Sequence, residues 1–402
     1  MSNSEQTPVD TDPQAASPIV QTTGTNAEAA GWRRWVGEFS GAFADLGTFL
    51  PLIIGIFAVQ RLDPTGVLLG FGLFALATAA IYRRPVPVQP MKAVAAVVIA
   101  GGLGAPEVAA TGLLLGIVLC VLAAAGLVGR LGRLIPDTVM MGIQLGVGLY
   151  LAWAGVRLGA EGPLIGIAAL VLLLWMQRTR LRPLAALTVI AGAALWGVLQ
   201  GGAALPELAL EPYWPTMVLP DLQAAWVSAT DVLLPQLALT LTNATVITAA
   251  IAADLFPRDR ERITPDRLAW STGVLNMALT PFGAFPMCHG AGGLVVQHRF
   301  GARTGLAPAI FGVSCLALAL FFGPNALALL SVLPLAAVGA LLLVAGIDLA
   351  FTNRLRRASS DRLVVIAIIG VSCVLANVAV GLFVGVVAEG LRTLVARGRA
   401  SP

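Results

Sequence analysis

The stretch Arg83–Ala96, RRPVPVQPMKAVAA, lies between two strongly apolar segments and governs how the rest of the chain is interpreted. It contains Lys92, the single lysine of the 402-residue sequence, at the start of a new apolar segment. Pro85, Pro87 and Pro90 favour an extended backbone here, because a proline lacks a donor and keeps the residue before it out of the helical region. The sequence therefore predicts that a helix begins near Lys92, within the apolar part of the protein.

The composition is that of a membrane protein. Hydrophobic residues make up 57% of the chain and charged residues 11%, whereas a soluble domain has roughly 25% charged residues. Apolar runs of about 20 residues, the length that crosses a bilayer, recur throughout. We expect an all-α polytopic membrane protein with about 14 transmembrane segments. The net charge of +4 then reflects loops that face the inner leaflet, and it does not indicate nucleic-acid binding.

The two halves of the chain resemble each other. Pro90-Met91 and Pro286-Met287 each precede a half-length apolar segment, and Ile135-Pro136 and Leu333-Pro334 each open a longer one at nearly the same spacing. Seven segments in each half, an odd number, make the repeats inverted in the membrane. Arginines concentrate in the loops that are cytoplasmic if the amino terminus is cytoplasmic. Inverted repeats with paired broken helices are typical of secondary transporters.

A division of the chain follows from this count. Residues 1–31 are expected to be a disordered cytoplasmic tail, since they are rich in Ser, Thr, Gln, Asp and Pro. The first inverted repeat spans 32–200, an extracytoplasmic connector 201–228, and the second repeat 229–395, before a cytoplasmic tail at 396–402. We expect a multi-pass protein in the lipid bilayer of the cell membrane, with both termini cytoplasmic.

The half-length segments that begin near Lys92 and His289 are expected to meet at the membrane midplane. Such a half-helix presents unpaired backbone N–H groups and the positive end of its dipole, which favour an anion. Lys92 adds an ammonium whose burial costs ~2.5 kcal/mol or more unless an anion, a carboxylate or water is nearby. The alternative is a lysine whose long side chain reaches the membrane interface. The prolines and the matching second segment favour the anion site.

Acidic and polar side chains in the flanking spans are further candidates. Asp45 aligns with Thr242 and Asn243 of the second half, and we expect it to pair with Lys92 or to carry a coupling proton. The alternative for Asp45 is a hydrogen bond between helices. His289 is a candidate for substrate contact or protonation, with a packing histidine as its alternative.

Two glutamates, Glu38 and Glu389, also lie within the spans. Glu38 lies nearer the cytoplasmic side and is a weaker proton-coupling candidate, and Glu389 is left without a role. The four cysteines are scattered and form no CxxC pair, so neither a disulfide framework, a metal site nor a cofactor is expected. The candidate substrate-binding residues are Asp45, Thr48, Gln89, Pro90, Met91, Lys92, Ala93, Thr242, Asn243, Cys288, His289, Gly290 and Ala291, and the proton-coupling candidates are Asp45, His289 and Glu38.

Three motifs, PVQPMKAVAA, FPMCHGAGGLVVQHRFGARTG and GAFADLGTFLP, together resemble the molybdate transporter family, a compact relative of the sulfate permeases. The resemblance covers about residues 32–395. It implies the fold of the uracil and sulfate transporters, with a core domain (32–128 and 229–322) and a gate domain (129–200 and 323–395). It also suggests a homodimer through the gate domain. The larger sulfate permeases append a cytoplasmic regulatory domain, which is not expected here. The family motifs carry over onto Gln89, Pro90, Met91, Lys92, Pro286, Met287, Cys288, His289 and Gly290.

The predicted function is import of a tetrahedral oxyanion by an elevator-like movement of the core against the gate, with a proton as candidate coupling ion. Molybdate and sulfate share shape and charge, so only the resemblance favours molybdate. The alternative is a proton-coupled nucleobase transporter of the same fold, although such a site needs carboxylates where this chain has Lys92 and Cys288. A retinal Schiff base is disfavoured because Lys92 follows a proline-broken stretch. No HExxH or GxSxG motif indicates an enzyme.

Overall fold

The structure is a computed structural model that describes residues 31–59, 62–179, 184–200, 214–215, 217–323, 325 and 332–400. The tail expected at 1–31 lies outside the described residues except for Gly31, which begins the first helix. Half of the connector expected at 201–228, residues 201–213 and 216, also lies outside them.

The described part of the first half is helical apart from one short strand, as an apolar chain requires, because a helix satisfies its own backbone polar groups. Its elements are α1 (Gly31–Ala42), α2 (Leu46–Ala58), α3 (Pro64–Tyr82), β1 (Gln89–Pro90), α4 (Lys92–Ile99), α5 (Ala105–Ala124), α6 (Val128–Leu134), α7 (Asp137–Gly159), α8 (Pro163–Gln177) and α9 (Ala185–Leu199).

The second half repeats this organisation, with π-helical and 3₁₀ segments labelled η. Its elements are α10 (Leu222–Ser228), η2 (Ala229–Leu233), α11 (Leu234–Leu239), η3 (Thr240–Ile247), α12 (Thr248–Leu255), η4 (Pro257–Asp259), α13 (Pro265–Leu279), η5 (Thr280–Phe282), β2 (Met287–Cys288), α14 (Ala291–Arg299), α15 (Leu306–Phe322), α17 (Leu335–Ala350), α18 (Asn353–Arg356), α19 (Ser360–Leu375) and α20 (Val378–Ala400).

Within the described residues, 5 helical stretches are long and apolar enough to cross a membrane: Arg34–Ala58, Pro64–Tyr82, Ala105–Ala124, Asp137–Gly159 and Leu222–Leu255. Several shorter apolar helices, α8, α9, α15 and α17 among them, accompany these spans. The expected class, an all-α membrane protein, is confirmed. The count of about 14 segments and the inverted repeats stay predictions.

The repeat boundaries stay predictions, but two helices extend beyond them. The helix that leads into the repeat expected from residue 229 begins with α10 at Leu222, where the Asp221 carboxylate caps it by accepting from the Ala224 N–H at 2.7 Å. At the other end α20 continues to Ala400, past the span end expected at 395.

The two spans expected to flank the site are both irregular. The first is broken at 43–45, between α1 and α2. The matching span of the second half contains the π-helix η3, which includes Thr242 and Asn243. π-Helical turns are rare and occur frequently at functional sites. The sequence predicted neither distortion.

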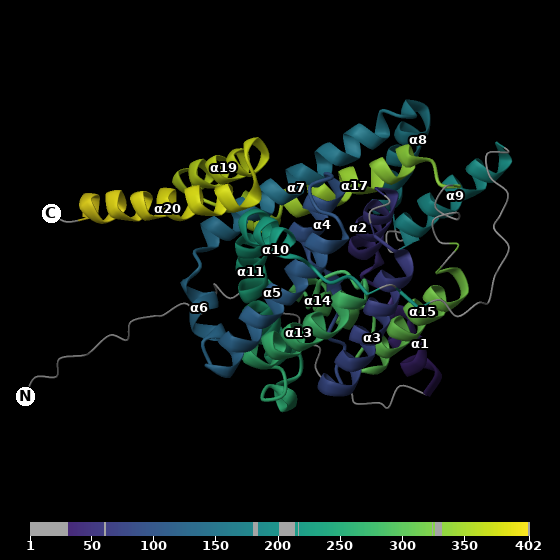
Figure 1. Ribbon diagram of the computed structural model, residues 1–402, viewed down its shortest axis with the longest axis horizontal. Helices are drawn as coiled ribbons and strands as arrows, with labels where there is room; N and C mark the ends of the chain where they lie inside the picture. The colour runs from purple at the N-terminus through teal and green to yellow at the C-terminus, as the bar shows by residue number, and fades with distance from the viewer. Residues whose placement is uncertain are drawn as a thin grey trace, which may run out of the picture.

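The helices form two groups, visible in Figure 1. In one group α7 packs against α17 and α19, and α17 also packs against α8; in the other, α3 packs against α15 and α5 against α13. Glycines bring α7 and α17 into backbone contact: a Cβ on Gly148 would lie 2.5 Å from the Gly346 carbonyl oxygen. Small residues of this kind let membrane helices approach closely and gain dispersion energy.

The two proline-containing breaks meet in the middle of the protein. Strands β1 and β2 pair antiparallel, with Gln89 opposite Cys288 and Pro90 opposite Met287. The Met91 N–H donates to the Pro286 carbonyl oxygen at 3.0 Å, which extends this contact. α4 and α14 begin directly beyond the paired strands, so the pairing brings the starts of the two half-length helices to one place.

Candidate functional site

The starts of α4 and α14 have no cap from the side chain of their own cap residue. These residues are Met91 and Gly290. In α4 the N–H of Ala93 donates to the Gln236 side-chain oxygen at 3.0 Å. Uncapped N–H groups at a helix start carry partial positive charge. The centre of the protein is therefore electropositive even before side chains are considered.

A chain of three side chains crosses this centre. Lys92 Nζ donates to Gln89 Oε1 at 3.0 Å, and Gln89 Nε2 donates to Asp45 Oδ2 in a short hydrogen bond. Within the described residues no salt bridge joins Asp45 to Lys92 directly. The predicted pairing of the two charges is thus made through the Gln89 amide, and we name the three residues the amide bridge.

Glycines of the second half make room for the amide bridge. A Cβ on Gly290 would lie 2.6 Å from Gln89 Cδ, and closer still to its Oε1. A Cβ on Gly293 would lie 2.6 Å from Asp45 Oδ2 and 2.8 Å from Gln89 Nε2. Ordinary contacts of a Cβ are 3.4–4 Å. The start of α14 therefore lies directly against the bridge, and a larger residue at either position would displace it.

A small cavity of about 40 Å³ lies on the lysine side of the bridge. Lys92, Cys288, Asn243 and Gln236 line it together with Gln144 of α7, and its remaining lining is apolar. Among the described residues, none of those that line this cavity is acidic. Because Lys92 shares the cavity with Cys288 from the second break, its contacts disfavour the alternative of a side chain that reaches the membrane interface.

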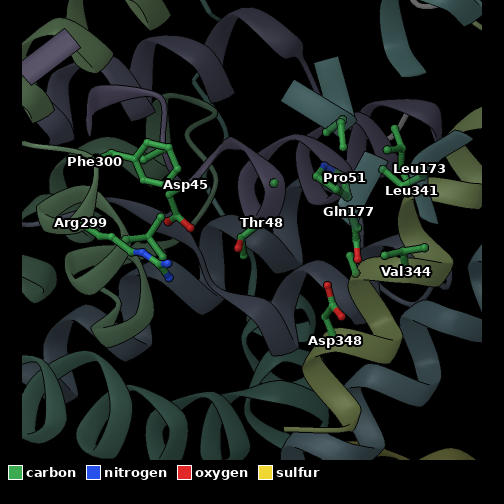
Figure 2. A pocket seen from close by; sticks show the side chains of 16 residues that line it. Asp45, Thr48, Pro51, Leu173, Gln177, Arg299, Phe300, Leu341, Val344 and Asp348 are labelled. Atoms are coloured by element: carbon green, nitrogen blue, oxygen red, sulfur yellow. The ribbon is translucent and has the colours of Figure 1, made fainter. Parts of the chain in front are cut away.

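A larger cavity of about 460 Å³ lies on the aspartate side (Figure 2). Asp45, Thr48 and Arg299 lie toward one end of the view, and Gln177 and Asp348 toward the other. The lining comes from α2 and α14 together with α8, α9 and α17. The amide bridge thus lies between two different cavities. The polar groups of the small cavity are hydrogen-bond donors and amides, whereas the large cavity is lined in part by carboxylates.

The other predicted substrate-binding residues occupy different positions. Thr48 lines the large cavity, whereas the Thr242 hydroxyl donates to the Ala238 carbonyl oxygen of its own span at 2.8 Å and lines neither cavity. Pro90, Met91, Ala93 and Ala291 are buried at the breaks, where they form the backbone of the site.

His289 lies in a packed cluster beside the site. It is 1% exposed, its Nδ1 lies 3.1 Å from the Pro87 carbonyl oxygen, and its Nε2 lies 3.3 Å from the Ser271 hydroxyl. The rings of Phe74 and Tyr82 contact it edge-on. His289 lines neither cavity, so these contacts favour the alternative of a packing histidine that ties the second break to the first.

Glu38 and Glu389 both have structural partners. Glu38 is 0% exposed, and its Oε1 accepts from the N–H groups of Arg303 and Thr304 at 3.0 Å and from the Thr304 hydroxyl at 2.9 Å. It therefore holds the loop before α15 and lines neither cavity. Glu389 accepts from the Arg392 guanidinium at 2.7 and 2.8 Å, which supplies the role that the sequence left open.

Three amides of the site were not predicted as contributors. Gln144 and Gln236 line the small cavity. Asn276 holds β2 from its outer side, since its amide accepts from the Met287 N–H at 2.8 Å and donates to the Met287 carbonyl at 2.7 Å. The sequence offered only a weak signal for these residues. An amide side chain in an otherwise apolar span costs free energy to bury and is often functional.

Comparison with known proteins places the chain in a family. A family model described as "Molybdate transporter of MFS superfamily" matches residues 37–151 and 228–349. The chain is 30% identical to molybdate transporter 2 of Arabidopsis thaliana over 87% of this chain and 86% of that protein, and 30% identical to molybdate transporter 1 of the same plant over 92% and 91%. The chain belongs to the molybdate transporter family. The expectation drawn from its motifs is confirmed, and this molybdate transporter family member is an anion transporter of the membrane.

Solved structures show the same fold. The transmembrane domain of a cyanobacterium bicarbonate transporter, BicA, matches with a TM-score of 0.65 at 16% identity, over 88% of this family member and 98% of that chain. The murine Slc26a9 anion transporter in the inward-facing state matches with a TM-score of 0.63 at 13% identity, over 90% and 68%. At these identities the likeness is one of fold.

Proposed function

We propose that the protein is a secondary active transporter that imports a tetrahedral oxyanion, molybdate in preference to sulfate. A core domain (32–128 and 229–322) would move against a gate domain (129–200 and 323–395) to give alternating access. The proposal includes two inverted repeats of seven segments, both termini in the cytoplasm, a place in the cell membrane and a homodimer through the gate domain.

The small cavity carries this proposal. The Lys92 ammonium has three donors, of which one goes to Gln89. The amides of Gln144 and Asn243 line the same space, and no hydrogen bond of either side chain occurs within the described residues. A volume of about 40 Å³ holds about three water-sized groups, so the cavity suits a small ligand. Donors that converge without a carboxylate suit a ligand that only accepts hydrogen bonds.

Molybdate is preferred over sulfate because of the relatives. Both curated plant relatives described above are named molybdate transporters. The donors around Lys92 do not separate the two anions, which share charge and shape. The same cavity disfavours a nucleobase, since its volume of about 40 Å³ is small for a planar ring and its polar lining offers no carboxylate to read ring N–H groups.

Asp45 is the proposed proton carrier. It lines the large cavity, through which water can reach it, and it is tied to Lys92 by one amide. A dianion that binds beside Lys92 adds negative charge near the Asp45 carboxylate, so protonation of Asp45 would favour binding. His289 and Glu38 are not part of this proposal, because neither lines the small or the large cavity.

Uptake into proteoliposomes tests the proposal. We expect labelled molybdate to accumulate in vesicles that contain the wild-type protein, faster when the outside is acidic, and unlabelled uracil not to compete. Lys92→Gln should lose uptake, whereas Arg157→Gln, which removes the same charge from the exposed end of α7, should keep it. Uptake by Lys92→Gln at the wild-type rate would refute the assigned site, and uptake of uracil in place of molybdate would refute the substrate class.

A further inference from the structure

We propose that Gln89 is a relay: protonation of Asp45 on one side of this amide releases Lys92 on its other side to bind the anion. The inference rests on the proposed function and adds to it the physical link between the proton and the anion. Gln89 is then a positioning residue that acts through its two charged neighbours.

The chemistry of the two neighbours sets the orientation of the amide. An ammonium only donates, so Lys92 requires the amide oxygen, and an ionised carboxylate only accepts, so Asp45 requires the amide nitrogen. The observed hydrogen bonds have this arrangement. Both bonds involve a charged partner, which makes them stronger than neutral hydrogen bonds. The amide dipole thus lies between opposite charges, and each charge strengthens the hydrogen bond that the other makes.

Gln89 has little freedom to leave this position. It is 3% exposed, its backbone is fixed in β1 opposite Cys288, and Gly290 and Gly293 of the second half lie against its amide. A change in the charge of Asp45 therefore acts on Lys92 through Gln89 and not through a general loosening of the site.

The two ends of the bridge face different cavities. Lys92 faces the small cavity with Cys288, and Asp45 faces the large cavity. The charged groups that share the large cavity with Asp45 are Arg299 at the end of α14 and Asp348 of α17. A proton from water in the large cavity can reach Asp45 without crossing the small one. The anion and the proton thus have separate places, joined by one side chain.

The sequence of events keeps charge and protons in balance. A proton from water in the large cavity binds to an Asp45 carboxylate oxygen, and the carboxyl becomes neutral. The bond from Gln89 then loses its charged acceptor, so the amide holds Lys92 less strongly. The ammonium turns a donor from Gln89 to an oxygen of the anion in the small cavity. Loss of the same proton restores the bridge and expels the anion.

Equilibrium binding of labelled molybdate to the purified full-length protein, measured as a function of pH, tests the relay. For the wild-type protein we expect the Kd to rise with pH by up to about tenfold per unit wherever Asp45 loses its proton, the limit for one linked proton. Gln89→Leu and Asp45→Asn should each bind molybdate with a Kd that varies less than about twofold per pH unit. Gln144→Leu, an amide of the same cavity outside the bridge, should bind more weakly at every pH and keep the wild-type slope.

The outcomes separate the relay from the proposed function. If Gln89→Leu keeps the wild-type slope while Asp45→Asn loses it, Asp45 acts on the anion directly and the relay is wrong. A pH-independent wild-type Kd also overturns the relay, but leaves the oxyanion site intact. Absence of molybdate binding at any pH refutes the proposed function itself. If Gln89→Leu does not fold, Gln89→Met, which has a side chain of similar length but no amide, takes its place in the same comparison with Asp45→Asn.

Discussion

Replacing Gly290 with alanine should break the amide bridge by steric overlap. The new Cβ would lie 2.6 Å from Gln89 Cδ, about 0.8 Å inside the 3.4 Å limit of ordinary contacts (3.4 − 2.6). The backbone of Gly290, with φ −149° and ψ 124°, suits alanine, so the strain falls on Gln89. Gln89 cannot keep its bonds to both Lys92 and Asp45 once it moves.

The size of the effect follows from the two hydrogen bonds. Each involves a charged group and contributes about 1.5–3 kcal/mol. Water from the two adjacent cavities can replace part of this loss, so we expect a destabilisation of roughly 3 kcal/mol, equal to one or two such bonds. For a protein of this length the melting temperature should fall by roughly 3–6 °C. The pH dependence of molybdate binding should weaken as well, because the relay is interrupted.

Gly292 provides the matched control. It lies two residues further along, in the first turn of α14, and a Cβ there would meet nothing within 4 Å. Gly292→Ala should unfold at or slightly above the wild-type temperature, because alanine favours a helix over glycine by up to about 1 kcal/mol. The assay is thermal unfolding of both purified variants in the same detergent, followed by molybdate binding at two pH values. Equal melting temperatures for the two variants would show that Gln89 does not lie against Gly290.

Three further predictions test neighbouring parts of the site. Glu38→Gln should lower the melting temperature, because the loop before α15 loses a charged acceptor worth about 1.5–3 kcal/mol, yet keep the pH dependence of binding; a lost dependence would restore Glu38 as a proton carrier. In a variant whose other cysteines are serine, molybdate should slow the modification of Cys288 by methyl methanethiosulfonate, a small reagent without a ring, and an unchanged rate would place the anion elsewhere. Asn276→Leu leaves the outer N–H and carbonyl of Met287 without partners, at about 1–3 kcal/mol each, and should reduce uptake at least tenfold; wild-type uptake would show that β2 does not need this support.

Much of the site could be predicted because backbone chemistry fixes it locally. Prolines before Lys92 and Cys288 cannot continue a helix, so two breaks and two helix starts follow from the residues near them. The meeting of the two helix starts follows from the family resemblance and the likeness of the two halves, whereas the pairing of the stretches before them as β1 and β2 was not predicted. These features depend on short stretches of chain, which is why the sequence reveals them.

The side-chain partners could not be predicted in the same way. The residue type alone does not tell whether a buried histidine or glutamate packs against its neighbours or transfers a proton. Only the three-dimensional contacts show that His289 and Glu38 line neither the small nor the large cavity. The pairing expected between Asp45 and Lys92 is made through Gln89, which hydrogen-bonds to both. Gln144 was missed because α7 has no break to mark it.

The position of bound molybdate is the most direct test of the account. Molybdenum scatters X-rays anomalously, so a crystal structure of the protein with molybdate, recorded near the molybdenum absorption edge, would locate the metal without reference to the fitted side chains. We predict one peak in the small cavity, with anion oxygens within hydrogen-bond distance of Lys92 Nζ and of the Asn243 and Gln144 amides. A peak beside Arg299 in the large cavity, with the small cavity empty, would contradict the account.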